Sequence, residues 1–238
     1  MSVIDVTLRK DLVFKPQGKG LSSAEALHGS YPGVVMKACR LQAGSEYVPE
    51  VYAKKTQIFF VTSGSGYIAR PATAHNITEE AVFVPLFDSE RFAIRAGGDM
   101  EFVEILADLT AEDLKTMHHM RMTLPHFRLH SACERYEEDF KGPGMVSRAI
   151  LQHRLLGRCS MGSVYAAGPN LTGEHSHEDL EQFFFGLGDT RFTFGADGES
   201  VVVEGGDFTH IPKKAKHSMR AEKGALLSYV WFEIINDA

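Results

Sequence analysis

The chain consists of many short apolar runs separated by turn-forming residues. Val, Ile, Phe and Tyr dominate the runs, and Gly, Pro, Asn and Asp stand between them, as is typical of β-strands joined by turns. The clearest runs cover residues 56–63, 81–87, 102–107, 163–168, 181–188, 199–206 and 226–234. Because little of the remaining sequence has a helical pattern, we predict an all-β sandwich or barrel.

The two halves of the chain also repeat each other. Three pairs of positions share an offset of 124 residues: Ala43-Gly44 with Ala167-Gly168, Gln57 with Glu181, and Gly64 with Gly188. Pro85 and Pro212 are offset by 127 residues, and the halves end alike, with FVEI at 102–105 and WFEI at 231–234. We therefore predict a duplicated β-domain, with an N-terminal barrel over 1–107, a linker over 108–144 and a C-terminal barrel over 145–238.

The expected linker contains the clearest helix signal. In residues 109–120, LTAEDLKTMHHM, Thr110 is a suitable N-cap and Asp113 follows it by three residues as a rough capping box. We expect the linker to be partly helical, and we interpret residues 126–140 as an ordinary polar connector.

Composition limits the partners and the compartment. The chain has 238 residues, 44% of them apolar, and a net charge of −6, which argues against nucleic acid or an anionic membrane as a partner. No apolar run reaches transmembrane length, and the first residues do not resemble a signal peptide. Cys39, Cys133 and Cys159 are odd in number and far apart, so we expect reduced thiols in a cytoplasmic protein.

Histidines gather before the run at 181–188. Residues two apart share a face of an extended strand, so His175 and His177 would converge, and Glu181 could join them after a tight turn. His217, five residues after Pro212, could supply a fourth ligand from another strand. Such ligands suit Fe(II), Mn(II), Ni(II), Co(II) or Zn(II). An octahedral metal would keep about two coordination positions open for water or substrate. Without His217, the residues around His175 and His177 could equally be interpreted as a polar loop before a strand.

These residues resemble the two motifs of the cupin family. The first motif, Gly-x5-His-x-His-x3,4-Glu-x6-Gly, is matched by His175, His177, Glu181 and Gly188, with Gly168 one residue too far upstream. The second motif, Gly-x5-Pro-x-Gly-x2-His-x3-Asn, is matched by Gly206, Pro212 and His217, with Lys214 and Ala221 replacing its glycine and asparagine. The lysine implies that the turn before His217 either avoids a left-handed conformation or bears its cost.

The resemblance covers the second half of the chain and, through the repeat, extends more weakly to the first. It implies a bicupin, two tandem jelly-roll barrels joined by a partly helical linker. It also implies that His175, His177, Glu181 and His217 bind one divalent first-row metal.

The first half lacks these ligands. At the repeat offsets, the three histidines correspond to Val51, Ala53 and Glu90, and Glu181 corresponds to Gln57. Val and Ala cannot bind a metal, so we interpret the first barrel as a metal-free structural domain.

Three further residues are candidates for the site. His210, two residues before Pro212, could share a face with the pocket or belong to the barrel wall. Lys214 could hold a substrate carboxylate or lie on a solvated loop. Tyr229, on the last strand, could form a wall of the pocket.

The residues leave the reaction open, because one fold hosts many activities. We expect an enzyme that binds a small oxygen-rich metabolite with a carboxylate, keto or enol group. It would act either as a dioxygenase or as a Lewis-acid lyase, isomerase or hydrolase. A non-catalytic binder or sensor is the alternative, and a monomer and a homodimer are equally compatible with the sequence.

Overall fold

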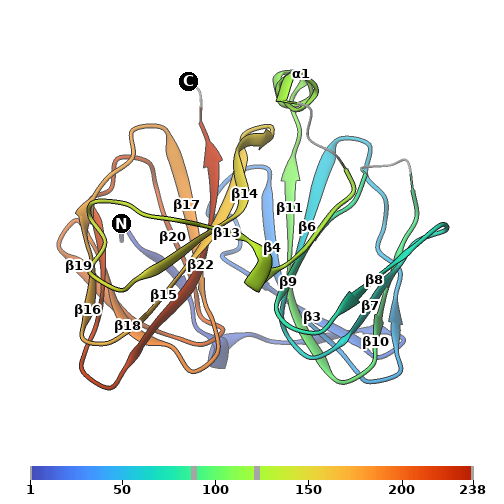
Figure 1. The fold of residues 1–238 in the computed structure, drawn as a ribbon, viewed down its shortest axis with the longest axis horizontal. Helices are drawn as coiled ribbons and strands as arrows, with labels where there is room; N and C mark the ends of the chain where they lie inside the picture. The colour runs from blue at the N-terminus through green and yellow to red at the C-terminus, as the bar shows by residue number, and fades with distance from the viewer. Residues whose placement is uncertain (1, 87–89, 121–123, 237–238) are drawn as a thin grey trace. The chain divides into compact units, whose positions relative to one another are not determined.

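A computed structural model describes residues 2–86, 90–120 and 124–236. The chain forms two compact units, each with a pair of β-sheets (Figure 1). The N-terminal unit contains Leu12–Leu114 and Arg121–Cys133, and the C-terminal unit contains Met1–Asp11, Lys115–Met120 and Glu134–Ala238.

The N-terminal unit has a seven-stranded and a four-stranded antiparallel sheet within its described residues. In spatial order, the larger sheet consists of β12 (His126–Leu129), β9 (Ala81–Val84), β6 (Lys55–Ser63), β11 (Met100–Asp108), β4 (Val34–Leu41), β3 (Leu21–Ala26) and β2 (Lys15–Gly18). The smaller sheet consists of β5 (Glu46–Tyr47), β10 (Ala93–Ala96), β7 (Gly66–Ala69) and β8 (Ala74–Ile77). Their inner faces share a core rich in phenylalanine, including Phe59, Phe83, Phe92 and Phe102.

The C-terminal unit repeats this arrangement. For its described residues, the larger sheet consists of β1 (Asp5–Thr7), β20 (Phe208–Ile211), β17 (Leu180–Gly186), β22 (Leu226–Ile235), β15 (Cys159–Ala167), β14 (Val146–Leu156) and β13 (Glu134–Tyr136). The smaller sheet consists of β16 (Asn170–His175), β21 (His217–Ala221), β18 (Arg191–Ala196) and β19 (Glu199–Glu204). Matching strand orders in the two units confirm the predicted all-β duplication.

The units differ from the expected ranges at one edge of each larger sheet. Strand β1 lies outside the expected C-terminal range but pairs with β20, and β12, from the expected linker, pairs with β9. An exposed sheet edge carries unpaired N–H and C=O groups, so each added strand satisfies one edge. The N-terminal segment is also held by Glu199, whose carboxylate accepts hydrogen bonds from Ser2 and Val3.

The facing of the side chains corrects the repeat offset around the candidate site. Gln57 and Phe59 of β6 face the core of the first unit, whereas in β17 Gln182 and Phe184 line a cavity and Glu181 does not. The offset of 124 read from the sequence, which matches Gln57 to Glu181, is therefore out of register by an odd number of residues. Since alternate residues of a strand face opposite sides, this slip exchanges the inner and outer faces.

The short helices lie outside the sheets. The two 3₁₀ turns, η1 (Arg9–Asp11) and η2 (His130–Ala132), follow strands β1 and β12. Helix α1 (Ala111–Met120) confirms the predicted helix and its cap. The Thr110 hydroxyl accepts the backbone N–H of Asp113 at 3.0 Å, and the Asp113 carboxylate accepts the backbone N–H of Thr110 at 2.7 Å. Within the part of the chain that the structure describes, no helix is long and apolar enough to span a membrane.

One close approach in the C-terminal barrel requires glycine. Gly162 of β15 pairs with Trp231 of β22, and a Cβ atom at residue 162 would lie 2.2 Å from Cζ2 of that indole and 2.7 Å from the Arg148 carbonyl oxygen. The carbonyl oxygen belongs to a paired strand and cannot move that far, so the indole ring would have to leave its position.

We predict that Gly162→Ala lowers the free energy of unfolding by about 1–3 kcal/mol, because the ring must leave its packed position. Urea denaturation measures the loss, and the fluorescence of Trp231, the only tryptophan of the chain, reports the displacement. Gly195→Ala is the matched control, since a Cβ there meets its nearest atoms at 3.5–4.0 Å. Equal stability of the two variants would contradict the packing described here.

Candidate metal centre and cavity

Three histidines converge at one end of the C-terminal barrel. His175 is the last residue of β16 and pairs directly with His217, the first residue of β21. His177 follows two residues after His175, and the ligand atoms of the three rings lie within 4.8 Å of one another. The ring centroids of His175 and His217 are 4.2 Å apart. Strand pairing thus brings together residues that are about 40 positions apart in the sequence.

Backbone carbonyls orient two of the rings. His175 Nδ1 lies 2.8 Å from the Gly173 carbonyl oxygen, and His217 Nδ1 lies 3.1 Å from that of Ala215. A carbonyl oxygen can only accept, so both Nδ1 atoms carry the hydrogen and both Nε2 atoms keep a free lone pair. This arrangement is typical of histidines that bind a metal through Nε2.

Burial keeps the three rings neutral. Loss of hydration lowers the pKa of His217 to about 3 and that of His177 to about 4, and the neighbouring histidines add repulsion in both cases. The pKa of His175 is lowered mainly for the same reason. Neutral imidazole is the form that binds metals.

The histidines lie on a cavity of about 390 Å³. Strands β17 and β22 contribute the opposite wall, with Gln182, Phe184, Tyr229, Trp231 and Glu233 facing inward. The volume is within the range of small-molecule sites, and the mixture of aromatic surface with a few polar groups is typical of them.

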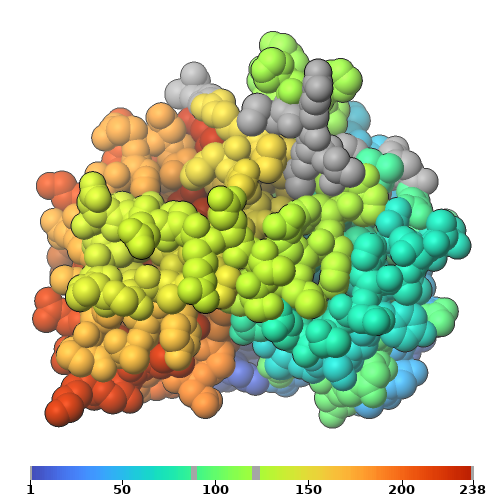
Figure 2. Space-filling view, viewed as in Figure 1, coloured from blue at the N-terminus to red at the C-terminus, as the bar shows by residue number. Residues whose placement is uncertain are grey.

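Residues 134–141, which form the covering segment, also line the cavity. Tyr136, Glu138, Phe140 and Lys141 are among the lining residues, and the Phe140 ring stacks on His175 with 3.9 Å between centroids. Figure 2 shows residues 134–141, in yellow-green, lying over the strands of this unit. The interpretation of residues 126–140 as an ordinary polar connector is therefore wrong at its C-terminal end.

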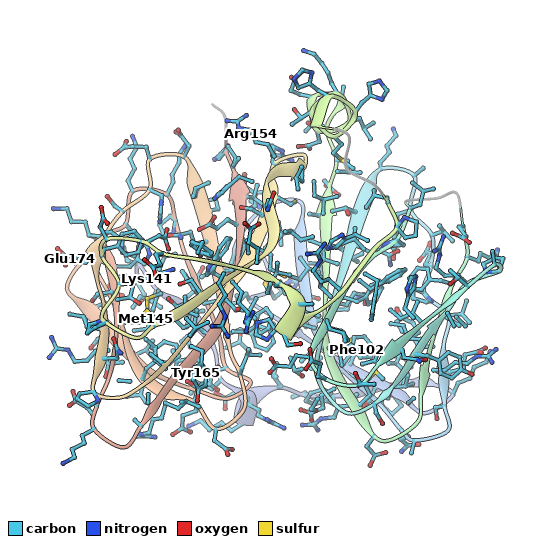
Figure 3. The ribbon with its side chains drawn as sticks, in the orientation of Figure 1. Phe102, Lys141, Met145, Arg154, Tyr165 and Glu174 are labelled. Carbon is cyan, nitrogen blue, oxygen red and sulfur yellow. The ribbon has the colours of Figure 1, made fainter. Side chains whose placement is uncertain are left out.

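Backbone contacts hold this segment against β16. Gly173 donates its N–H to the Phe140 carbonyl oxygen at 2.7 Å, and Gly142 donates to that of Leu171 at 2.9 Å. Figure 3 labels Lys141, at the end of this segment, and Met145, which follows it. A signal was present in the sequence, because Tyr136, Glu138 and Phe140 have the period of two that is typical of an extended strand.

Glu181 is not with the histidines. It follows Leu180 and precedes Gln182, both of which line the cavity, so its side chain lies on the opposite face of β17. There its carboxylate lies 3.0 Å from His210 Nε2. The residue five positions after His177, which does face the cavity, is Gln182.

The other candidates are divided between the two faces. His210 lies beside Glu181 and packs on Phe183, away from the cavity. Tyr229 is buried, lines the cavity and is hydrogen-bonded to Thr172, and burial raises its pKa.

Lys214 supports the loop before His217 instead of facing the cavity. Its exposed ammonium group lies 3.8 Å from Glu178, and its backbone N–H donates to the His177 carbonyl oxygen at 2.8 Å. Its φ of 72° means that the turn bears the cost of a left-handed conformation.

Two polar groups of the cavity are absent from the sequence-based candidates. Glu233 accepts hydrogen bonds from Gln182 at 2.8 Å and from Ser160 at 3.2 Å, and burial raises its pKa to about 7. Lys141 donates to the Ser147 hydroxyl at 2.7 Å and forms an ion pair with Glu138, and burial lowers its pKa. The repeated FVEI and WFEI sequences contained a signal for Glu233, because they mark a shared acidic position.

The N-terminal barrel has aromatic packing where the histidines would be. Phe92 stands two residues before Ile94, as His217 stands two residues before Met219, and its ring packs among core phenylalanines. Phe92 thus stands in the place of His217, whereas Glu90, which the sequence offset matched to His217, forms an ion pair with Arg70. On the inner face of β6, Gln57 likewise donates to a buried glutamate, Glu104, at 3.3 Å.

No family model and no curated protein matches the sequence. Solved structures do match. A putative glyoxylate-induced protein from Pseudomonas aeruginosa has a TM-score of 0.79 and 12% identity, covering 100% of this chain and 91% of its own. A cupin 2 conserved barrel domain protein from Leptotrichia buccalis has a TM-score of 0.64 and 14% identity, covering 99% and 98%.

A variant of oxalate decarboxylase from Bacillus subtilis has a TM-score of 0.73 and 11% identity, covering 98% of this chain and 77% of its own. Sequence identities this low show that the folds are alike but do not show that the activities are. The chain therefore has the same fold as these cupin proteins, with two matching barrels in tandem.

Proposed function

We propose that the C-terminal barrel binds one divalent first-row metal through His175, His177 and His217. Bound there, the metal would activate a small oxygen-bearing metabolite in the adjoining cavity. The convergence of three neutral imidazoles on this cavity is the observation that carries the proposal. We assign the chain to the metal-dependent enzymes of the cupin superfamily.

The residues present suit such a metal. Imidazole nitrogens accommodate Fe(II), Mn(II), Ni(II), Co(II) and Zn(II), and the carbonyl contacts of His175 and His217 leave Nε2 free in both rings. Because Glu181 lies on the other face, the set of protein ligands is neutral. A neutral set leaves the positive charge of the metal to be balanced by an anionic ligand, which favours a carboxylate, an enolate or another negatively charged oxygen.

The chain's own residues would position the metabolite. Phe140, Phe184 and Trp231 offer aromatic surface to its carbon skeleton, while Gln182 and Tyr229 offer polar groups from the wall. Phe140 stacks on the His175 ring and would shield that side of the cavity from water. When bound, the metal would supply Lewis-acid polarisation of a substrate oxygen.

Two reaction classes use these parts, and oxygen dependence separates them. Turnover under anaerobic conditions would assign the protein to the lyases, isomerases or hydrolases. Oxygen uptake by the iron-loaded protein with a diketone or catechol substrate would assign it to the dioxygenases. Stoichiometric binding without turnover would assign it to the non-catalytic binders.

We predict that His217→Ala weakens zinc binding by more than about 100-fold, because it removes a ligand and not only an outer partner. Isothermal titration calorimetry of the metal-free protein measures the affinity. Glu181→Gln is the matched control, since that side chain is hydrogen-bonded to His210 on the opposite face, and it should retain zinc within about threefold of the wild-type affinity.

Two results would overturn the ligand assignment. Loss of zinc binding in the Glu181→Gln variant would show that the Glu181 carboxylate is a metal ligand after all. Unchanged zinc binding in the His217→Ala variant would show that zinc does not bind at the proposed three-histidine site.

We also predict a pH-dependent contribution of His217 to stability. Its folded pKa is lowered from 6.5 to about 3, so the unfolded chain takes up the proton first as pH falls. Stability from the neutral ring is therefore present above about pH 6.5 and decreases below it, by about 2 kcal/mol at pH 5.

The measurement compares metal-free wild-type protein with the His217→Gln variant by urea denaturation at pH 7.5 and pH 5. Comparing the two proteins is necessary because Glu233, whose folded pKa is raised, changes stability in the opposite direction over this range. A stability difference that is the same at both pH values would show that the His217 ring is not held neutral.

A further inference from the structure

Glu233 is a buried acid that forms no ion pair with a lysine or arginine among the residues that the structure describes. It lies on β22, faces the cavity and is 5% exposed. Its two hydrogen bonds come from neutral groups, the Gln182 amide and the Ser160 hydroxyl. Lys141 lines the same cavity but is paired with Glu138.

The N-terminal barrel contains the same acid in a different environment. Glu104 of β11 pairs with Lys37 of β4, and the lysine ammonium group lies 3.4 Å from its carboxylate. Glu233 of β22 pairs with Ser160 of β15 at the corresponding position. The cation that neutralises the buried acid in the first barrel is thus a serine in the second.

This exchange changes what the carboxyl group can do. A buried carboxylate beside an ammonium group is a structural ion pair and remains charged. Without the cation, desolvation favours the protonated acid and raises the pKa of Glu233 to about 7, where both forms coexist. A group of this kind can both give and take a proton at neutral pH.

Other titratable groups near Glu233 come from several elements. His153 of β14 places its Nε2 4.0 Å from the carboxylate, and its exposed ring stacks on Trp231. The remaining ones are Tyr136, Glu138 and Lys141 of the covering segment and Tyr229 of β22.

We propose that Glu233 is the proton-transferring group of this cavity, acting on substrates held near the three histidines. In the forward sense, a C–H or O–H bond of the substrate breaks, its electron pair stays on the substrate, and the proton forms an O–H bond with Glu233. In the reverse sense, the Glu233 O–H bond breaks and the proton passes to a substrate carbon or oxygen. No oxidant or reductant takes part.

The proposal deepens the proposed function, on which it rests for the substrate's position, and it favours lyase, isomerase or hydrolase chemistry over oxygenation. The proton-transfer step itself needs neither the metal nor the natural substrate. It can therefore be tested separately in the metal-free protein.

The test uses 5-nitrobenzisoxazole, a planar aromatic probe suited to an aromatic-lined cavity. A base removes its ring C–H proton, the N–O bond breaks, and the electron pair passes to oxygen to give a coloured phenolate. We expect metal-free protein to accelerate this elimination by about 100-fold over acetate at equal concentration. The rate should rise with pH through about 7, because the carboxylate form is the base.

Glu233→Gln should reduce the rate to background, while Glu104→Gln, the matched change in the other barrel, should leave it unchanged. Ser160→Lys introduces the counter-ion found in the first barrel. It should lower the midpoint of the pH dependence of the elimination rate by about one pH unit or more. Circular dichroism verifies that each variant is folded, and if Ser160→Lys fails to fold, Glu233→Gln alone decides.

An elimination rate that survives in Glu233→Gln, or a wild-type rate equal to that of acetate, would overturn the assignment. Zinc titration of the same variants separates the two proposals. Normal zinc binding with no elimination would refute the role of Glu233 and leave the metal centre intact. Elimination without zinc binding would refute the metal centre instead.

Discussion

The alternation of side chains along paired antiparallel strands is the constraint on which this site depends. Pairing of β16 with β21 places His175 opposite His217, and pairing of β17 with β22 places Gln182 opposite Glu233. Each strand has one inward and one outward series of residues, so a single position decides whether a side chain meets the cavity or the far face. For this reason the adjacent residues Glu181 and Gln182 face opposite sides of β17.

Desolvation then determines the chemical state of what faces inward. The three histidines stay neutral because a charged imidazolium would lose its hydration, and the pKa of Glu233 is raised for the corresponding reason. Two carbonyl oxygens select the tautomer of His175 and His217. The cavity therefore presents free imidazole lone pairs at one end and an exchangeable acid on its wall.

The two barrels share one scaffold but differ in the side chains on their inner faces. Both retain the strand order, the inward glutamine and the buried glutamate on the last long strand. In the first barrel, Phe92 takes the place of His217 and Lys37 neutralises Glu104. An aromatic ring in place of an imidazole, and a lysine in place of a serine, distinguish the inner surfaces of two barrels with the same strand order.

The sequence by itself determined the class of fold, the duplication, the capped helix and the three histidines. Strand periodicity, turn residues, a capping box and His-x-His spacing are local properties, and the tertiary structure does not alter them. The sequence could not determine which neighbour of a strand faces inward. The repeat offset and the motif spacing each allow a one-residue slip, and only the ladder between β17 and β22 resolves it in favour of Gln182. The tertiary structure alone also decided that Phe140 covers the His175 ring and that neutral groups donate the hydrogen bonds to Glu233, because both depend on contacts between residues far apart in the chain.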